Sequence, residues 1–262
     1  MGTQRALASK APRTRNQPPT VLRGGGGTLG SIPVRGFLSI RGFVKNETRM
    51  APAPAFDEDF RERLRALLAW RRDVRRFRPD PLPPGAVERL TASAALAPSV
   101  GLSQPWRFVL VDDPARRAAI RAGFAAANAA AIAGLAPERA ARYLRLKLAG
   151  LDEAPCHLAV FADRATAQGH GLGRRTMPET IEYSAVAAVH GLWLVARAEG
   201  IGMGWVSILD PAAVGEILDI PSAWKLIGYF CLGYPAEEEE KPMLETAGWE
   251  RRRPAASFLF RR

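Results

Sequence analysis

The chain has 262 residues, of which 47% are hydrophobic, so one substantial core is expected and several large domains are excluded. No run of 18 apolar residues occurs, and the sequence therefore predicts neither a membrane span nor a membrane partner. The net charge of +11 would suit nucleic acid, but residues 1–50 hold nine Lys or Arg against one acid, Glu47. The rest carries 28 bases and 25 acids and has no recognised nucleic-acid motif, so no nucleic-acid partner is predicted.

Residues 1–50 are predicted to be a disordered, basic N-terminal extension. They contain a proline pair, Pro18-Pro19, and a glycine run, Gly24 to Gly27, without sustained periodicity. The shortage of acids is typical of a targeting segment. The other interpretation is a start codon assigned too early, with Met50 as the true start; it is slightly favoured because no amphipathic helix is evident. Residues 51–262 are expected to form a single domain.

The folded part is expected to begin near Phe56 with a helix. Asp57 is a suitable N-cap, and apolar residues follow at helical spacing: Phe60, Leu64, Leu67 and Leu68. Further helices are predicted over about 84–96, 114–134, 137–149, 179–199 and 211–218. Strands are predicted over 106–111, 158–162, 203–208 and 227–232. Residues 258–260 are apolar and predict an extended arm of the kind that docks on a partner subunit.

Within the helix predicted over 179–199, the segment 184–192 is apolar and small nearly all round, which predicts burial or close packing against another backbone. Three glycines follow the helix: Gly200, Gly202 and Gly204. They stand between a helix and a strand, the reverse of a dinucleotide-binding turn. We interpret them as a helix C-cap and a turn.

Neither the histidines nor the cysteines predict a metal site. His157, His170 and His190 lack HxxxH or HExxH spacing, and His157 and His190 are interpreted as core or interface residues. Cys156 and Cys231 lie in apolar contexts without CxxC spacing, and are interpreted as buried thiols of a reducing compartment. A cytoplasmic location is therefore expected.

The run Arg71-Arg72-Asp73-Val74-Arg75 is the first candidate site. Guanidinium groups bind phosphate bidentately, and a carboxylate between them can act as an acceptor or base. The other interpretation, given even odds, is a solvated helix end with cations at the negative end of the dipole.

The segment PSVGLSQPW, residues 98–106, is the second candidate. Proline and glycine stiffen the turn, so Ser103 and Gln104 can present a hydroxyl and an amide to a planar heterocycle. The plainer interpretation is an ordinary loop with a core tryptophan, Trp106.

Two further features carry weaker signals. Ser207 is predicted to lie inside an apolar strand, where its hydroxyl needs a backbone or ligand partner. The basic run Trp249-Glu250-Arg251-Arg252-Arg253 is either a solvated surface or a second phosphate clamp.

Taken in chain order, these segments resemble one family. The motifs RRDVRRF, PSVGLSQPWRF, EAP, RTMPET, EYS, GIGMGWVSI and GWERR are similar to those of the BluB-type 5,6-dimethylbenzimidazole synthases of the nitroreductase superfamily, over about residues 56–255. The resemblance implies an α+β, nitroreductase-like fold with a central, mainly antiparallel sheet flanked by helices. It also implies an intertwined homodimer with FMN at the subunit interface.

The resemblance also implies roles for individual residues. The run Arg71 to Arg75, Val74 included, is expected to contact FMN, with at least one arginine on the phosphate. Ser103 and Gln104 are expected on the ring or ribityl chain, and either Arg251 or Arg252 on the phosphate. Asp73 and Ser207 match the two functionally important polar positions of the family and are the expected catalytic residues.

In that family reduced FMN is the substrate. With O2 it is fragmented to 5,6-dimethylbenzimidazole, the lower ligand of cobalamin, and erythrose 4-phosphate, while a separate flavin reductase consumes NAD(P)H. The alanine-rich helices over 114–149 are expected to supply a lid. The alternative is an NAD(P)H-dependent FMN nitroreductase or flavin reductase, including one that reduces cob(II)yrinic acid a,c-diamide.

Overall fold

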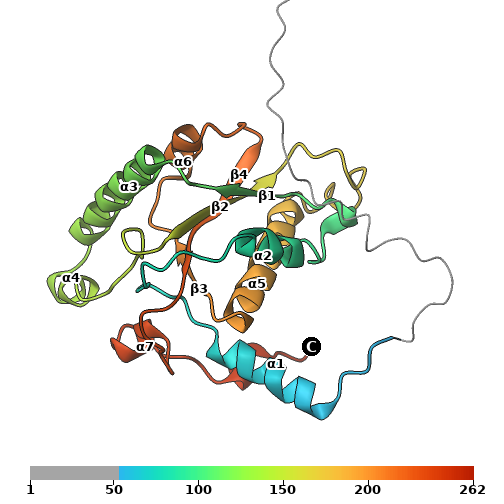
Figure 1. Cartoon of the computed structure of the whole chain (residues 1–262), viewed down its shortest axis with the longest axis horizontal. Helices are drawn as coiled ribbons and strands as arrows, with labels where there is room; N and C mark the ends of the chain where they lie inside the picture. The colour runs from blue at the N-terminus through green and yellow to red at the C-terminus, as the bar shows by residue number, and fades with distance from the viewer. Residues whose placement is uncertain (1–52) are drawn as a thin grey trace, which may run out of the picture. The chain divides into compact units, whose positions relative to one another are not determined.

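The computed structural model describes residues 53–262, and Ala55–Arg262 form one compact unit (Figure 1). The predicted disorder of residues 1–50, and the choice between an early start and a targeting segment, lie outside the described residues. Within the described chain, no helix combines the length and the apolar character needed to cross a membrane.

A four-stranded antiparallel sheet forms the centre of the unit. Its strands are β1 (Trp106–Leu110), β2 (Cys156–Asp163), β3 (Gly202–Val206) and β4 (Trp224–Gly233), in the order β1-β2-β4-β3. Each neighbouring pair is antiparallel. The predicted mainly antiparallel sheet is therefore confirmed.

Seven α-helices surround this sheet in the described chain. They are α1 (Glu58–Trp70), α2 (Ala86–Ala94), α3 (Pro114–Ala133), α4 (Pro137–Tyr143), α5 (Thr180–Ala198), α6 (Pro211–Leu218) and α7 (Met243–Thr246). Local chemistry sets several of the starts: Asp57, Asp113 and Asp210 are N-caps whose side chains accept from backbone N–H groups of the first turn.

The helix predicted over 137–149 is wrong at its end, because α4 stops at Tyr143. The chain beyond it is drawn into tertiary contacts that a continued helix would not allow. Leu151 is buried in the core, and Gly150 lies so close to the Phe77 ring that a Cβ there would overlap it.

Two hydrophobic layers cover the two faces of the sheet. Helices α2 and α5 pack on one face with Leu158 and Val160 of β2, and α3 and α6 pack on the other with Ala159 and Phe161 (Figure 1). The alternation follows the two-residue period of a strand. Because both faces of β2 are buried, the strand is apolar along nearly its whole length.

Helix α5 is not buried all round. Its inner face is in the core, but Tyr183, Val186 and His190 are exposed along one side. The predicted burial holds for the inner face of this helix, and the core position for His190 is wrong; its other predicted place, an interface, stays a prediction. A further surface would be needed to cover this side.

His157 is a core residue, as predicted. It is 1% exposed, and its Nδ1 lies 2.9 Å from the hydroxyl of Tyr229 on β4. Burial, followed by the positive charges of Arg117 and Arg121, lowers the pKa of His157 from 6.5 to about 4. The two cysteines are likewise buried and free, and burial raises the pKa of Cys156 to about 11.

The lowered pKa of His157 predicts acid sensitivity of the fold. The folded state holds His157 neutral, so its contribution is complete above pH 6.5 and is lost as the pH falls toward 4. The shift corresponds to about 3 kcal/mol of unfolding free energy. Urea unfolding at pH 7 and pH 4.5 should show a smaller loss in His157→Asn than in the wild type. The control, His170→Asn at an exposed position of φ 50°, should keep the wild-type loss.

Candidate functional site

The segment that follows α1 runs beside strand β3. The N–H of Val74 donates to the carbonyl of Met203 at 3.1 Å, and the N–H of Trp205 donates to Oδ1 of Asp73 at 2.8 Å. A parallel bridge joins Asp73 and Met203. These contacts hold the Asp73 carboxylate at the edge of β3.

Glycines make this close approach possible. A Cβ on Gly204 would overlap the carbonyl oxygen of Val74, and one on Gly202 would lie 2.9 Å from a Val74 methyl group. Gly200, with φ 74°, follows the end of α5 as predicted. The prediction of a turn at Gly202 and Gly204 is wrong, since both lie inside β3.

Asp73 and Arg75 form an ion pair beside this strand. Oδ2 of Asp73 accepts from Nη2 of Arg75, whose side chain is only 13% exposed. Among residues 53–262, the buried Nη1 of Arg75 has no hydrogen-bond partner. Burial raises the pKa of Asp73 above its ordinary value, opposed by Arg75 and by the N–H of Trp205. A carboxylate with a raised pKa beside a spare guanidinium donor can take up a proton near an anionic ligand.

Arg71 and Arg72 are placed differently from one another. Helix α1 ends at Trp70, so both arginines follow the helix and do not occupy its last turn. The guanidinium of Arg72 donates to four backbone carbonyls, those of Ala69, Arg71, Glu239 and Glu240. Arg71 instead lies over the Trp193 ring, with Cζ 4.7 Å from its centroid. Of the two, Arg71 is the better placed to meet a ligand.

Arg252, in the basic C-terminal run 249–253, lies close enough to Arg71 and Arg72 for its charge to act on both. Burial lowers the pKa of Arg71; Asp73 opposes this, and the charge of Arg252 adds to it. The pKa of Arg72 is lowered by burial and then by Arg252. Within residues 53–262, Arg71 and Arg252 form no salt bridge with a carboxylate. Because the nearby Asp73 is paired with Arg75, these two cations are left without a direct counter-charge and form a site suited to an anion. Of the two arginines left open by the sequence, Arg252 is the one in this cluster.

The turn PSVGLSQPW has the unusual backbone that its residues suggest. Leu102 and Gln104 have φ of 55° and 42°, and the N–H of Gln104 donates to Oγ of Ser99 at 3.1 Å. Ser103 is 2% exposed, and in the described part of the chain its Oγ has no hydrogen-bond partner. Trp106 is buried in the core, so the plainer interpretation also holds for that residue. The roles of Ser103 and Gln104 as ligand contacts stay predictions.

The placement of Ser207 inside a strand is wrong. Strand β3 ends at Val206, and Ser207 is exposed in the loop that leads to α6. Its hydroxyl is therefore open to a ligand and needs no buried protein partner. The N–H of Trp205 donates to the Asp73 carboxylate, and Ser207 follows Trp205 by two residues. Ser207 is therefore close in sequence to that contact.

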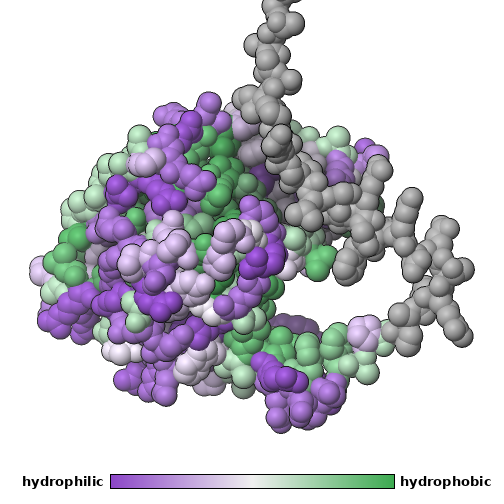
Figure 2. All heavy atoms as spheres, in the orientation of Figure 1, coloured by the Kyte–Doolittle hydropathy of each residue, from purple (hydrophilic) through white to green (hydrophobic). Residues whose placement is uncertain are grey.

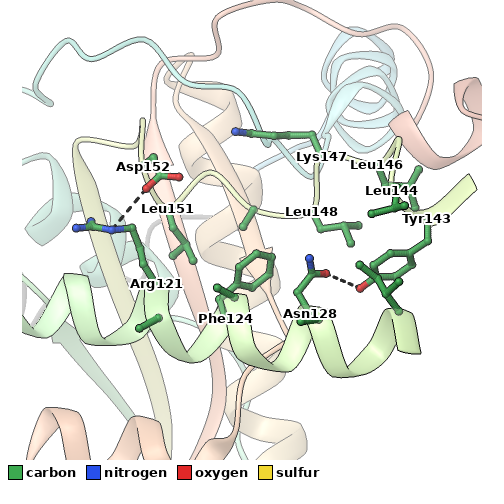
Figure 3. Close-up of a pocket in the computed structure, with 15 residues that line it drawn as sticks. Arg121, Phe124, Asn128, Tyr143, Leu144, Leu146, Lys147, Leu148, Leu151 and Asp152 are labelled. Carbon is green, nitrogen blue, oxygen red and sulfur yellow. Dashed lines mark hydrogen bonds and ion pairs between the residues drawn. The ribbon is translucent and has the colours of Figure 1, made fainter. Parts of the chain in front are cut away.

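A cavity of about 670 Å³ lies between α3 and the segment 143–152 (Figure 3). Tyr143 donates to Asn128 across one end at 2.7 Å, and Arg121 faces Asp152 at 3.5 Å at the other. None of the predicted site residues lines it. Two residues of its wall, Ala149 and Leu151, belong to the hydrophobic layer that α3 and α6 cover. Val74 and Val206 lie in the same layer, and they are the sequence neighbours of Asp73 and Ser207. The lining residues belong to no motif, which is why sequence reasoning missed them; the lid stays a prediction.

The sequence and the fold correspond to a known family. The model of the nitroreductase family matches residues 68–234, a span that includes the arginine run, the PSVGLSQPW turn and strand β3. The chain belongs to the nitroreductase family.

Two relatives are more specific. The chain is 58% identical over 205 residues to the 5,6-dimethylbenzimidazole synthase of Rhodospirillum rubrum, covering 78% of this chain and 97% of that one. It is 48% identical to the enzyme of the same name from Rhodobacter capsulatus, over 76% of this chain and 96% of that one. The crystal structure of iodotyrosine deiodinase bound to FMN and 3-iodo-L-tyrosine has a TM-score of 0.58 at 25% identity, covering 67% and 91% of the two chains.

Proposed function

We propose that this chain is a 5,6-dimethylbenzimidazole synthase. Its substrates are reduced FMN and O2, and its products are 5,6-dimethylbenzimidazole and erythrose 4-phosphate. The observation that carries the proposal is the 58% identity to the Rhodospirillum rubrum enzyme over almost all of that enzyme's length. We place the activity in residues 51–262, which include the whole family match.

The residues around Asp73 fit FMN. The charges of Arg71 and Arg252 act on each other, and neither arginine forms a salt bridge within the described chain; Asp73, the nearby acid, is paired with Arg75, so both cations can meet the phosphate. In the described chain, Arg75 keeps a buried N–H donor that has no protein partner. The buried hydroxyl of Ser103 also has no hydrogen-bond partner there. Such orphaned groups are costly unless a ligand or water satisfies them. Both groups belong to the motifs noted in the sequence, Arg75 to RRDVRRF and Ser103 to PSVGLSQPWRF.

The chain's own groups would hold the flavin and manage protons. When bound, the reduced flavin supplies the electrons that reduce O2. The Asp73 carboxylate, held by Trp205 and paired with Arg75, accepts a proton at Oδ2. The exposed hydroxyl of Ser207 would be available to donate a hydrogen bond to the flavin. Helices α3 and α4 limit the access of water.

We also propose that the enzyme is a homodimer. Helix α1 buries none of its residues within the described chain, and its apolar side chains Phe60, Leu64 and Leu68 are each at least 40% exposed. Figure 2 shows hydrophobic atoms over α1 and the segment before it, beside hydrophilic atoms on its outer side. The exposed side of α5 and the apolar residues 258–260 add to this surface. An apolar area this extended favours a second copy as its cover.

One further partner and a cellular location complete the proposal. The chain depends on a separate, NAD(P)H-consuming flavin reductase for reduced FMN. A cytoplasmic location is proposed because both cysteines are free thiols, as expected of a reducing compartment.

The product of the reaction tests the proposal. Purified chain is mixed with FMN, NADPH and an added flavin reductase, exposed to air, and analysed by mass spectrometry. The expected result is 5,6-dimethylbenzimidazole with matching loss of FMN, and no product when the reductase is left out. Intact FMN together with NADPH oxidation by the chain alone would overturn the proposal and favour the nitroreductase or flavin reductase alternative.

A further inference from the structure

Gln168 lies in the loop between β2 and α5, against the PSVGLSQPW turn. Its Nε2 donates to the carbonyl of Leu102 at 2.8 Å and to Oε1 of Gln104 at 3.0 Å. The two backbones meet beside it, because a Cβ on Gly169 would lie 2.5 Å from the carbonyl oxygen of Gly101. One exposed side chain therefore joins two residues of a turn that is more than 60 positions away in the sequence.

The chemistry of these two bonds fixes the orientation of both amides. A backbone carbonyl can only accept, so Gln168 must present its NH2 group to Leu102. The same nitrogen meets the Gln104 side chain, so the atom of Gln104 at that contact must be the acceptor Oε1. The NH2 group of Gln104 then points away from Gln168. Within residues 53–262 it has no hydrogen-bond acceptor.

The turn needs such a restraint. Leu102 and Gln104, the two residues that Gln168 binds, have positive φ values although neither is glycine. Residues other than glycine rarely adopt this conformation and hold it only where the surroundings impose it. Between them stands Ser103, whose buried hydroxyl has no partner in the described chain. Gln168 thus holds the backbone of Leu102 on one side of Ser103 and the side chain of Gln104 on the other.

We propose that Gln168 is a positioning residue that makes Gln104 a hydrogen-bond donor toward its ligand. The ligand atom that faces Gln104 must then be an acceptor, such as a carbonyl oxygen or an unprotonated ring nitrogen of a planar heterocycle. This inference rests on the proposed function, in which that heterocycle is the isoalloxazine of FMN. It adds a residue outside the family motifs and assigns the polarity of one contact.

The test compares Gln168→Glu with Gln168→Ala. A carboxylate at position 168 can only accept, so it repels the Leu102 carbonyl and draws the NH2 of Gln104 inward. The affinity for oxidised FMN, measured by quenching of flavin fluorescence, should fall about 10-fold in Gln168→Glu. It should fall less in Gln168→Ala, where Gln104 keeps its donor but loses its restraint. His170→Asn, an exposed change in the same loop, should bind FMN as the wild type does.

A double-mutant cycle separates positioning from general damage to the loop. In a Gln104→Ala background, Gln168→Glu should lose most of its effect, because the reversed amide is no longer present. Riboflavin affinity should change by the same factor as FMN affinity, since the contact is to the ring. An equal effect of Gln168→Glu with and without Gln104, or wild-type affinity in a folded Gln168→Glu variant, would overturn the proposal. Flavin binding is measured without turnover, so a chain that binds FMN but makes no benzimidazole would refute the proposed reaction alone.

Discussion

Asp73→Asn should abolish formation of 5,6-dimethylbenzimidazole while FMN binding stays within a few-fold of the wild type. Asn has the same shape, and its Oδ1 can still accept from the N–H of Trp205, so the segment should remain on β3. It cannot take up a proton. Loss of a positioned general base costs about 100-fold or more in rate, which would place product below ordinary detection.

The pH dependence of the wild type provides a second measure of the same group. A base must be ionised, so product formation should fall as the pH falls through the pKa of Asp73. Because burial raises that pKa, the acid limb should lie above the range of an ordinary aspartate. Single-turnover product yield at a series of pH values, with reduced FMN in excess, would locate this limb.

The ion pair with Arg75 calls for its own control, since Asn at position 73 leaves the guanidinium without its counter-charge. Arg75→Lys keeps a cation beside an intact carboxylate and should retain measurable product. Normal turnover by Asp73→Asn would refute the base role. Loss of FMN binding together with activity would instead mean that the carboxylate acts by holding Arg75 in place.

Arg252→Ala should weaken FMN binding by about 10-fold to 100-fold, the range expected for removing a charged hydrogen bond to phosphate. Arg252 is the C-terminal arginine whose charge is felt at Arg71 and Arg72. Arg72 has its donors engaged by backbone carbonyls, so Arg252 and Arg71 are better placed than Arg72 to meet an anion there. Isothermal titration with oxidised FMN measures the change directly.

The neighbouring residue and a ligand without phosphate provide matched controls. Arg251→Ala removes the same charge one position earlier and should have little effect, because the charge that acts on Arg71 and Arg72 is that of Arg252. Riboflavin lacks the phosphate, so its affinity should be the same for Arg252→Ala and the wild type. An equal loss for riboflavin and FMN, or an equal loss in the two arginine variants, would contradict a specific phosphate contact.

Much of the fold could be predicted because its signals are local. Asp57 caps α1 as expected, and the continuous apolar run of β2 marks a strand buried on both faces. The motifs around Asp73, Ser103 and Trp205 were sufficient to indicate the nitroreductase fold, since their order along the chain is specific. Helix caps, strand periodicity and motif order all act over a few residues and can be seen in one sequence.

The sequence by itself determined the elements, the family and the residue types of the candidate site. Tertiary structure decided which of them meet. Ser207 lies beyond β3 and is exposed, and Gly202 and Gly204 leave room for the Asp73 segment beside β3. Arg252, Gln168 and the cavity wall over 143–152 lie at positions that no local pattern indicates. The physical reason is that contacts between segments far apart in the chain depend on packing of the whole core, which the spacing of neighbouring residues does not encode.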